Sequence, residues 1–331
     1  MLVSVIAILL AGSVAADNTV YGKVRLYLEL GTQDGVAEGK DQVSVQSFSS
    51  RIGFKGSDEL DNGLSSIYVI EAGVGDEQED SPHIRLLYAG IKGDFGQAAI
   101  GSQWTPSYVL VRGVHDPFDT GAGGDLYGGG FPADGRIADA ISFTKEFGDV
   151  SVAAAVVADE GSNSFNDQTD IAVSLPVGPF KVGVAFATSS AAGSPSPVAL
   201  NLGWVSGVFA VDLGYFMRDQ KKVEAVQAVA GVPAGPGPDG DFGKTADNIA
   251  AVEAVDAVDA DTGDDWMVLT GSLKTGSGKI IAQFENNGTD NQFSAAYLHS
   301  MSKRTSLFAE LTNGDMAMNQ FNVGIMVNFY N

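Results

Sequence analysis

The regular alternation of short and long connections constrains the fold of this chain more than any other feature of the sequence. From residue 20 onward, segments of about ten residues alternate apolar and polar side chains. This period of two is typical of β-strands, because successive side chains point to opposite faces. Sixteen such segments can be marked out: 20–28, 50–55, 64–72, 84–92, 95–103, 137–144, 150–157, 170–175, 180–187, 197–205, 208–216, 266–275, 279–285, 292–299, 305–312 and 319–330.

Every second connection between these segments is short and rich in turn residues, as at 93–96, 146–149, 176–179 and 275–278. The others are mostly longer and acidic, or rich in Gly and Ser. In an up-and-down meander this alternation puts the short turns at one end, which with an even strand number is typical of outer-membrane barrels. A soluble β-sandwich does not require this alternation of short and long connections. We therefore predict an all-β fold, a 16-stranded antiparallel transmembrane β-barrel, since in lipid only helices and closed barrels pair every backbone group.

The first sixteen residues are uncharged, with a continuous apolar core followed by Gly12, Ser13, Ala15 and Ala16. This pattern predicts a signal peptide (1–16), although no Lys or Arg precedes the apolar run. A membrane anchor is the alternative, but the apolar part is shorter than the roughly 20 residues that a spanning helix needs. The predicted mature barrel is therefore 17–331.

Composition argues against several functional classes. The chain has no Cys and only three scattered His, so we expect no disulfide, metal site or cofactor. The net charge of −22 argues against a nucleic-acid partner, because the phosphates would not be neutralised. His115 stands beside Asp116, but no nucleophile motif such as Gly-x-Ser-x-Gly accompanies the pair. We therefore predict no catalytic residues and no enzyme.

The connection 104–135 is unusually long for a compact domain, which generally indicates function or disorder. Its aromatic residues favour an ordered loop packed against something: Trp104, Tyr108, His115, Phe118, Tyr127 and Phe131. It is also acidic, with Asp116, Asp119, Asp125 and Asp134. We predict that this loop folds into the barrel and narrows it. The 217–265 connection, by contrast, is low in complexity and is predicted to be an outer surface loop.

Alternation divides the strands into two faces. The predicted lipid-facing residues are Ile52, Phe54, Ile84, Leu86, Val323 and Ile325, and the predicted lumen-facing ones are Lys23, Arg51, Arg85, Arg136 and Asn322. The four cations can cluster on one arc of the inner wall opposite Asp116 and Asp119, which would create a transverse field in a narrow aqueous gap. Arg25, Lys55 and Asp125 are secondary lumen candidates. The alternative is that these are ordinary surface cations, or salt bridges that hold the loop.

The chain resembles the general (non-specific) trimeric porins of Gram-negative outer membranes. The similarity is strongest at Val20-Tyr21-Gly22-Lys23-Val24, Ser50-Arg51-Ile52-Gly53-Phe54-Lys55-Gly56, Gly63-Leu64-Ser65-Ser66-Ile67-Tyr68 and Arg85-Leu86-Leu87-Tyr88-Ala89-Gly90-Ile91-Lys92-Gly93. The resemblance implies sixteen strands, a third loop folded into the lumen, and a basic cluster at Lys23, Arg51, Arg85 and Arg136. It also implies a homotrimer in the lipopolysaccharide-containing outer membrane. Family members end on an aromatic residue read by the barrel-assembly machinery, whereas this chain ends Tyr330-Asn331.

The predicted function is passive diffusion of small hydrophilic solutes and ions through a water-filled pore in the outer membrane. Ion preference stays open, because the loop acids favour cations while Lys23, Arg25, Arg51, Lys55, Arg85 and Arg136 favour anions. One alternative is a secreted, acidic, β-rich surface or adhesin protein, which would be extracted without detergent. Another is an outer-membrane barrel hydrolase, whose activity would be lost on Ser→Ala or His→Ala changes.

Overall fold

The computed structural model describes residues 17–31, 42–75, 82–118, 135–158, 167–190, 196–217, 265–315 and 319–330. The predicted signal peptide, residues 119–134 of the predicted constriction loop and residues 218–264 of the long outer loop lie outside these ranges.

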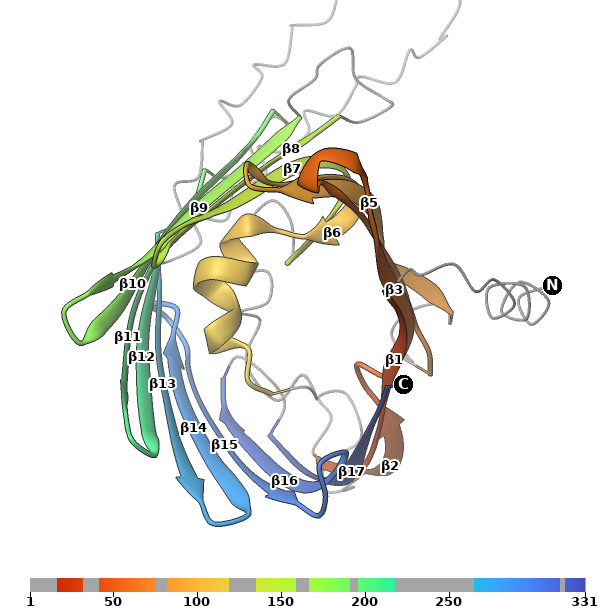
Figure 1. Cartoon of the computed structure of the whole chain (residues 1–331). Coiled ribbons are helices and arrows are strands. Elements are labelled where there is room, and N and C mark those ends of the chain that lie inside the picture. The colour runs from red at the N-terminus through yellow and green to blue at the C-terminus, as the bar shows by residue number, and fades with distance from the viewer. Residues whose placement is uncertain are drawn as a thin grey trace, which may run out of the picture.

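The described chain is almost entirely antiparallel strands that form a barrel (Figure 1). The strands are β1 (Asp17–Gly31), β2 (Gln42–Ser47), β3 (Arg51–Glu59), β4 (Ser65–Gly73), β5 (His83–Gly93), β6 (Gly96–Trp104), β7 (Arg136–Phe147), β8 (Val150–Val157), β9 (Gln168–Val177), β10 (Phe180–Ser189), β11 (Val198–Ser206), β12 (Phe209–Met217), β13 (Trp266–Thr275), β14 (Gly278–Asn286), β15 (Asn291–Ser300), β16 (Thr305–Gly314) and β17 (Gln320–Tyr330).

The strands close into a barrel of sixteen, as predicted. β2 and β3 both pair with β1, through Leu26 with Ser47 and Lys23 with Arg51, so together they form one interrupted barrel strand. β1 also pairs with β17, from Tyr21 with Tyr330 to Gly31 with Gln320. This last pairing joins the first strand to the last and leaves a 16-stranded antiparallel barrel.

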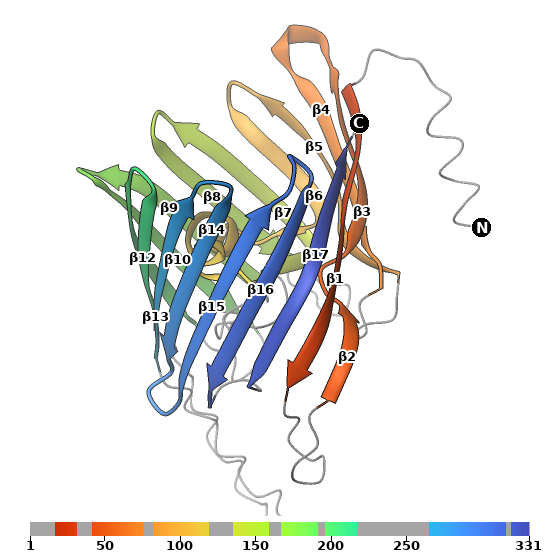
Figure 2. The same cartoon turned by 90° about the horizontal axis from the view of Figure 1, so that it is seen from below.

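The short turns lie together at one end of the barrel (Figure 2). Several contain a glycine with positive φ: Gly148 at 63°, Gly178 at 60°, Gly207 at 61° and Gly276 at 51°. Two-residue hairpin turns that match the strand twist require this backbone region, which glycine adopts without a steric cost. The turn chemistry in the sequence therefore encodes the short-turn end directly.

The two faces of the barrel wall differ as expected for a lipid-facing exterior. On β1 and β17, Leu26, Val323 and Ile325 point outward and are 41–43% exposed. On the inner face of the same strands, Lys23 and Asn322 are almost fully buried. Directly paired residues share a face, so this division extends around the barrel from strand to strand.

Leu86 is a correction to the predicted lipid-facing set. Ile84 and Leu87 are exposed, at 57% and 49%, whereas Leu86 is 5% exposed and belongs to the inner side. The register of β4 against β5 shifts between Glu71 and Ala72, because β5 carries one extra residue at this point. Such a bulge reverses the alternation beyond it, and a simple period of two cannot show it.

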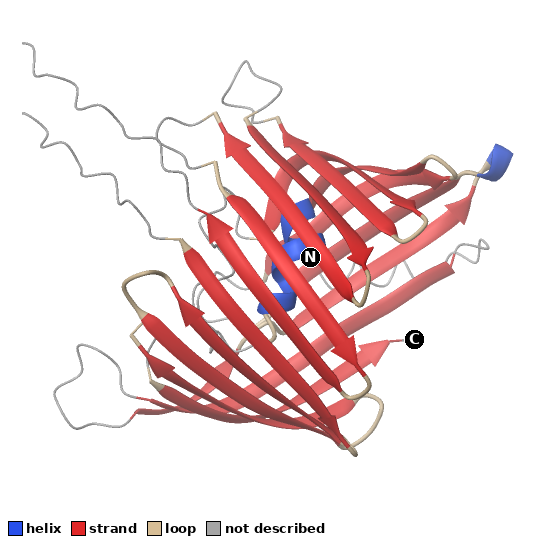
Figure 3. Cartoon of the chain, turned by 90° about the vertical axis from the view of Figure 1, so that its left-hand side faces the viewer, coloured by secondary structure: helices blue, strands red, loops and turns tan. Residues whose placement is uncertain are grey.

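Helical structure among the described residues is short. A 3₁₀ turn, η1 (Asp61–Gly63), lies between β3 and β4 at the rim. A π-helical turn, η2 (Tyr108–Arg112), and a 3₁₀ turn, η3 (Gly113–His115), follow β6 and lie inside the barrel (Figures 1 and 3). Within the described ranges, no helix has the length and apolar character needed to cross a membrane.

Candidate functional site: the barrel lumen

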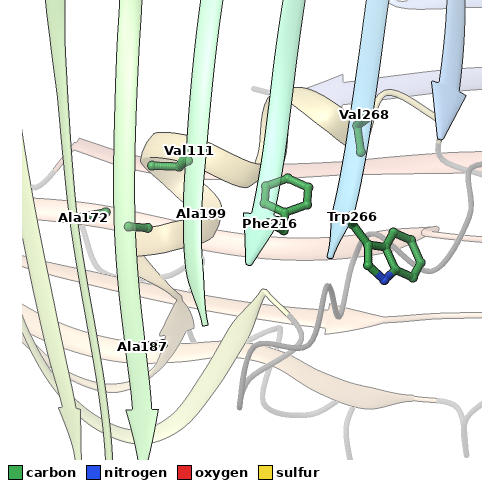
Figure 4. Packing of buried hydrophobic residues seen from close by; sticks show 8 residues of the cluster. Val111, Ala172, Ala187, Ala199, Phe216, Trp266 and Val268 are labelled. Carbon is green, nitrogen blue, oxygen red and sulfur yellow. The ribbon is translucent and has the colours of Figure 1, made fainter. Parts of the chain in front are cut away.

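Residues 105–118, here called the lumen segment, lie inside the barrel and pack against the inner wall formed by β9 to β15 (Figure 1). Val111 is fully buried in a cluster with Ala172, Ala185, Ala187, Ala199, Phe216, Trp266 and Val268 (Figure 4). The alanines leave room for the turn to approach the sheet. Farther along, Phe118 packs against Ile281 and Ala296 on β14 and β15. The apolar side of the segment is thus held over much of one half of the wall.

A buried carboxylate holds the start of the lumen segment. The backbone N–H of Ser107 donates to Asp170 Oδ1 at 2.7 Å, and its hydroxyl donates to Oδ2 at 2.5 Å. Arg112 Nε donates to Ser107 Oγ at 3.3 Å. All three side chains are at most 3% exposed. Hydrogen bonds to a charged acceptor are stronger than neutral ones, so Asp170 is a firm anchor.

His115 holds the other end of the helical part. Its Nε2 lies 2.8 Å from Asn201 Oδ1, and its Nδ1 lies 3.0 Å from Thr270 Oγ1. An amide oxygen only accepts, so Nε2 carries the proton and Nδ1 accepts from the Thr270 hydroxyl. Gln283 Nε2 completes the set by donating to Thr270 Oγ1 and to the backbone oxygen of His115. Burial lowers the pKa of His115 to about 4, against a smaller opposing effect of the Asn201 bond.

Aromatic and acidic groups also contact each other around the lumen segment. Trp104, at the end of β6, stacks on Tyr108 with ring centroids 4.7 Å apart. The Tyr108 hydroxyl donates to Asp116 Oδ2 at 2.6 Å. Of the predicted constriction acids, Asp116 therefore lies in the lumen segment, and Asp119 lies outside the described residues, as does the secondary candidate Asp125.

The four predicted basic residues come together on the inner wall of β1 to β7, and the stack of Tyr108 on Trp104 brings the beginning of the lumen segment to them. Lys23 and Arg51 both donate to Ser49 Oγ, at 3.3 and 3.1 Å. Ser49 lies in the break between β2 and β3 with a φ of 63°, a strained conformation for a residue other than glycine. The break therefore places the Ser49 hydroxyl oxygen where it accepts hydrogen bonds from both Lys23 and Arg51.

Glu71 and Trp104 link the rest of this basic cluster. Glu71 accepts from Arg85 Nε at 2.8 Å and lies 3.7 Å from Arg51 Nε. The guanidinium carbons of Arg85 and Arg136 lie 6.0 and 5.7 Å from the Trp104 ring centroid, within the range of a cation–π contact. An acid and an aromatic residue thus keep the four cations together on one arc.

The secondary candidates lie elsewhere on the inner wall. Arg25 forms a buried ion pair with Glu310 on β16, and its guanidinium stacks 3.8 Å from the centroid of Phe308. This arrangement ties β1 to the closing strands and gives Arg25 a structural role. Lys55 is exposed toward the short-turn end, 5.4 Å from the centroid of Tyr21.

Sequence reasoning missed several residues that build this site, namely Glu71, Ser49, Asp170, Asn201 and Thr270. Glu71 could have been found, because it is an acid on the inner face of a strand between two strands with inward arginines. The partners of the lumen segment carry no such local signal. Within the described ranges, no group of three or more His, Cys, Asp or Glu residues could hold a metal ion.

Comparison with known proteins identifies relatives in sequence and in structure. A family model described as Gram-negative porin matches residues 3–316. The major outer membrane protein P.IB of Neisseria meningitidis is 34% identical over 126 residues, which cover 35% of this chain and 38% of that protein. The P.IB protein of Neisseria sicca is 33% identical over 107 residues, or 30% of each chain. The aligned part of the chain thus spans 38% or less of the length of these relatives.

Solved structures share the fold at low sequence identity. A loop-deletion variant of OmpT from Vibrio cholerae superposes with a TM-score of 0.68 at 17% identity, covering 96% of this chain and all of that one. An anion-selective porin from Comamonas acidovorans gives 0.64 at 16% identity, covering 95% and 100%. OmpF of Salmonella typhi gives 0.68 at 14% identity, covering 95% and 97%. The closed barrel and the family match over nearly the whole sequence show that the chain belongs to the Gram-negative porin family, whose place is the outer membrane.

Proposed function

We propose that this protein is a passive diffusion pore for small hydrophilic solutes and ions. The observation that carries the proposal is the juxtaposition inside the closed barrel. The lumen segment is docked on β9 to β15, and the basic cluster lies on the inner wall of β1 to β7. A polar lumen surrounded by an apolar exterior is the arrangement that porins use to hold water across a bilayer.

In this proposal, Lys23, Arg51, Arg85 and Arg136 form one side of the constriction, and Asp116 and Asp119 form the other. Asp125 is a further candidate on the same loop. Opposite charges across a narrow aqueous gap with low-dielectric walls produce a transverse field. Such a field orders water and orients dipolar solutes without binding them tightly. Glu71 and Trp104 would act as positioning residues for the arginines.

Conductance of the purified protein in planar bilayers tests the proposal. We expect discrete conductance steps for the wild type and an altered step size for Arg51→Ala and Arg136→Ala, since both changes remove bulk and charge from the gap. Lys303→Gln, in the exposed short turn before β16, is the matched control and should leave the step size unchanged. Absence of steps would defeat the pore, and steps insensitive to both arginine changes would defeat the constriction.

The family resemblance further supports a homotrimer, contact with lipopolysaccharide, assembly by the barrel-assembly machinery and cleavage of residues 1–16. Cross-linking in detergent tests the trimer, and N-terminal sequencing of the mature protein tests the cleavage. We also propose that the protein is not an enzyme. Hydrolysis of model esters or peptides that is lost on His115→Gln would overturn this, since His115 is followed by Asp116 in the sequence.

A further inference from the structure

The register of β1, β3, β4 and β5 places lysines beyond the basic cluster, toward the short-turn end. Lys23 pairs with Arg51, and two pairs farther along the same inner face Thr19 pairs with Lys55. Lys55 in turn pairs with Val69, which pairs with Tyr88. Four residues beyond Tyr88 on β5, Lys92 pairs with Ser65 and with Gln97. The inner wall thus contains cations at three successive levels.

These levels are close enough to act on the same passing ion. Four residues along a strand advance about 13 Å. The long side chain of each lysine extends over part of the distance between two levels, and the Debye length is about 10 Å at 0.1 M salt. The potential of the basic cluster therefore merges with those of Lys55 and Lys92. Together they form a basic lane from the middle of the barrel to its short-turn mouth.

A cavity of about 760 Å³ lies in the last part of this lane. Both Lys55 and Lys92 line it, together with hydroxyl and amide groups from Thr19, Ser57, Ser65 and Gln97. The ammonium groups supply positive charge and the neutral groups supply hydrogen bonds. This combination suits a small oxyanion such as phosphate or a carboxylate, with part of its hydration shell retained.

Among the described residues, the carboxylates near the basic lane do not neutralise Lys55 and Lys92. Glu71 is engaged by Arg51 and Arg85. Asp94 lines the cavity at its turn, and Glu59 ends β3 opposite Ser65. Among the described residues, no ion pair joins Lys55 or Lys92 to any of these carboxylates. The ammonium groups therefore have no fixed counter-ion among the described residues, and that of Lys55 lies 5.4 Å from the centroid of the Tyr21 ring.

We infer that the basic lane conducts anions, and that the cavity at Lys55 and Lys92 is a weak binding site for small oxyanions on their way through the pore. The inference rests on the proposed function, since it needs an open lumen. It assigns a preference that the overall charge of −22 would not suggest. The local charge along the path of the ion decides the preference, because charges beyond a Debye length are screened.

The experiment measures ion preference and phosphate block in planar bilayers at low ionic strength. A unit charge about 7 Å away in water changes the local anion concentration about threefold. Replacing both lysines by glutamine, as Lys55→Gln with Lys92→Gln, should therefore lower the chloride-to-potassium permeability ratio threefold or more. The same double variant should weaken block of the chloride current by inorganic phosphate to a similar extent. Lys303→Gln, at the same rim but outside the lane, should change neither quantity.

The outcomes separate this inference from the proposed function. Normal conductance steps, with permeability ratio and phosphate block equal to those of the wild type in the double variant, would overturn the inference and leave the pore standing. A wild type without steps would remove the pore and the inference with it. A change in permeability ratio without any phosphate block in the wild type would retain the lane and reject the binding site.

Discussion

Acidification should loosen the lumen segment, because docking buries His115 in its neutral form. The docked imidazole has a pKa of about 4, and an exposed one has 6.5. Between these values the undocked segment binds a proton that the docked segment does not. Docking is therefore fully stable above pH 6.5 and weakens as the pH falls toward 4. By linkage the loss is about 2 kcal/mol at pH 5 and about 3 kcal/mol at pH 4.

The contacts of His115 explain the direction of this effect. Its side chain is 1% exposed and lies between Asn201, Thr270 and Phe216, and no carboxylate of the described residues bonds to it. Asp212 is bonded to Asn201 and reaches the imidazole only through that amide. A positive charge on the ring would thus be desolvated with little compensation.

Hydrogen exchange measures the effect directly. Backbone amides of residues 107–115, corrected for intrinsic exchange, should lose about twentyfold in protection between pH 7 and pH 5, whereas strand amides serve as an internal control. His115→Gln keeps one donor and one acceptor but does not titrate, so its protection should be independent of pH. Equal losses in the wild type and this variant, or no loss in either, would refute the reasoning.

Three further changes test other parts of the structure. Asp170→Ala removes the acceptor of two hydrogen bonds from Ser107 and should weaken docking of the lumen segment by about 3 kcal/mol. Trypsin should then cleave at Arg112, which is buried in the wild type, and Asp58→Ala at the rim is the control. Gly324→Val places a Cβ 2.3 Å from the Leu26 carbonyl oxygen, where β17 pairs with β1, and should lower the stability of the barrel by at least about 2 kcal/mol. The loss is measured as disappearance of the heat-modifiable folded band in gel electrophoresis. Gly271→Val, whose Cβ meets nothing nearer than 3.9 Å, should be tolerated. Glu71→Gln removes the acid between Arg51 and Arg85 and should raise the chloride-to-potassium permeability ratio about threefold, a rise that an unchanged reversal potential would contradict.

Local patterns were sufficient to predict most of the barrel. Alternating faces and glycine-containing turns depend on neighbours in sequence, and they predicted sixteen strands and a short-turn end, both confirmed. The strand order also followed, because each strand in a meander pairs with the next. The proximity of Lys23, Arg51 and Arg85 could be anticipated for the same reason, since all three alternate inward on strands near the start of the chain.

Local patterns were insufficient where pairing is irregular or distant. Residues 42–47 were not assigned to a strand, although they extend β3 beyond the break at Ser49. Leu86 was placed on the wrong face, because one extra residue in β5 reverses the alternation. Arg25 looked equivalent to Lys23 by spacing, yet its partner Glu310 is 285 residues away.

The sequence by itself therefore determined the architecture: an apolar exterior, a polar interior and connections that alternate in length, all of which follow from side-chain period and turn chemistry. Only the tertiary structure decided where the lumen segment docks on the inner wall. The lumen segment is held by Asp170, Asn201, Thr270 and Gln283, which lie 63 to 168 residues from their partners. Such contacts arise only when the closed barrel brings distant strands around the same interior, so no local pattern could reveal them.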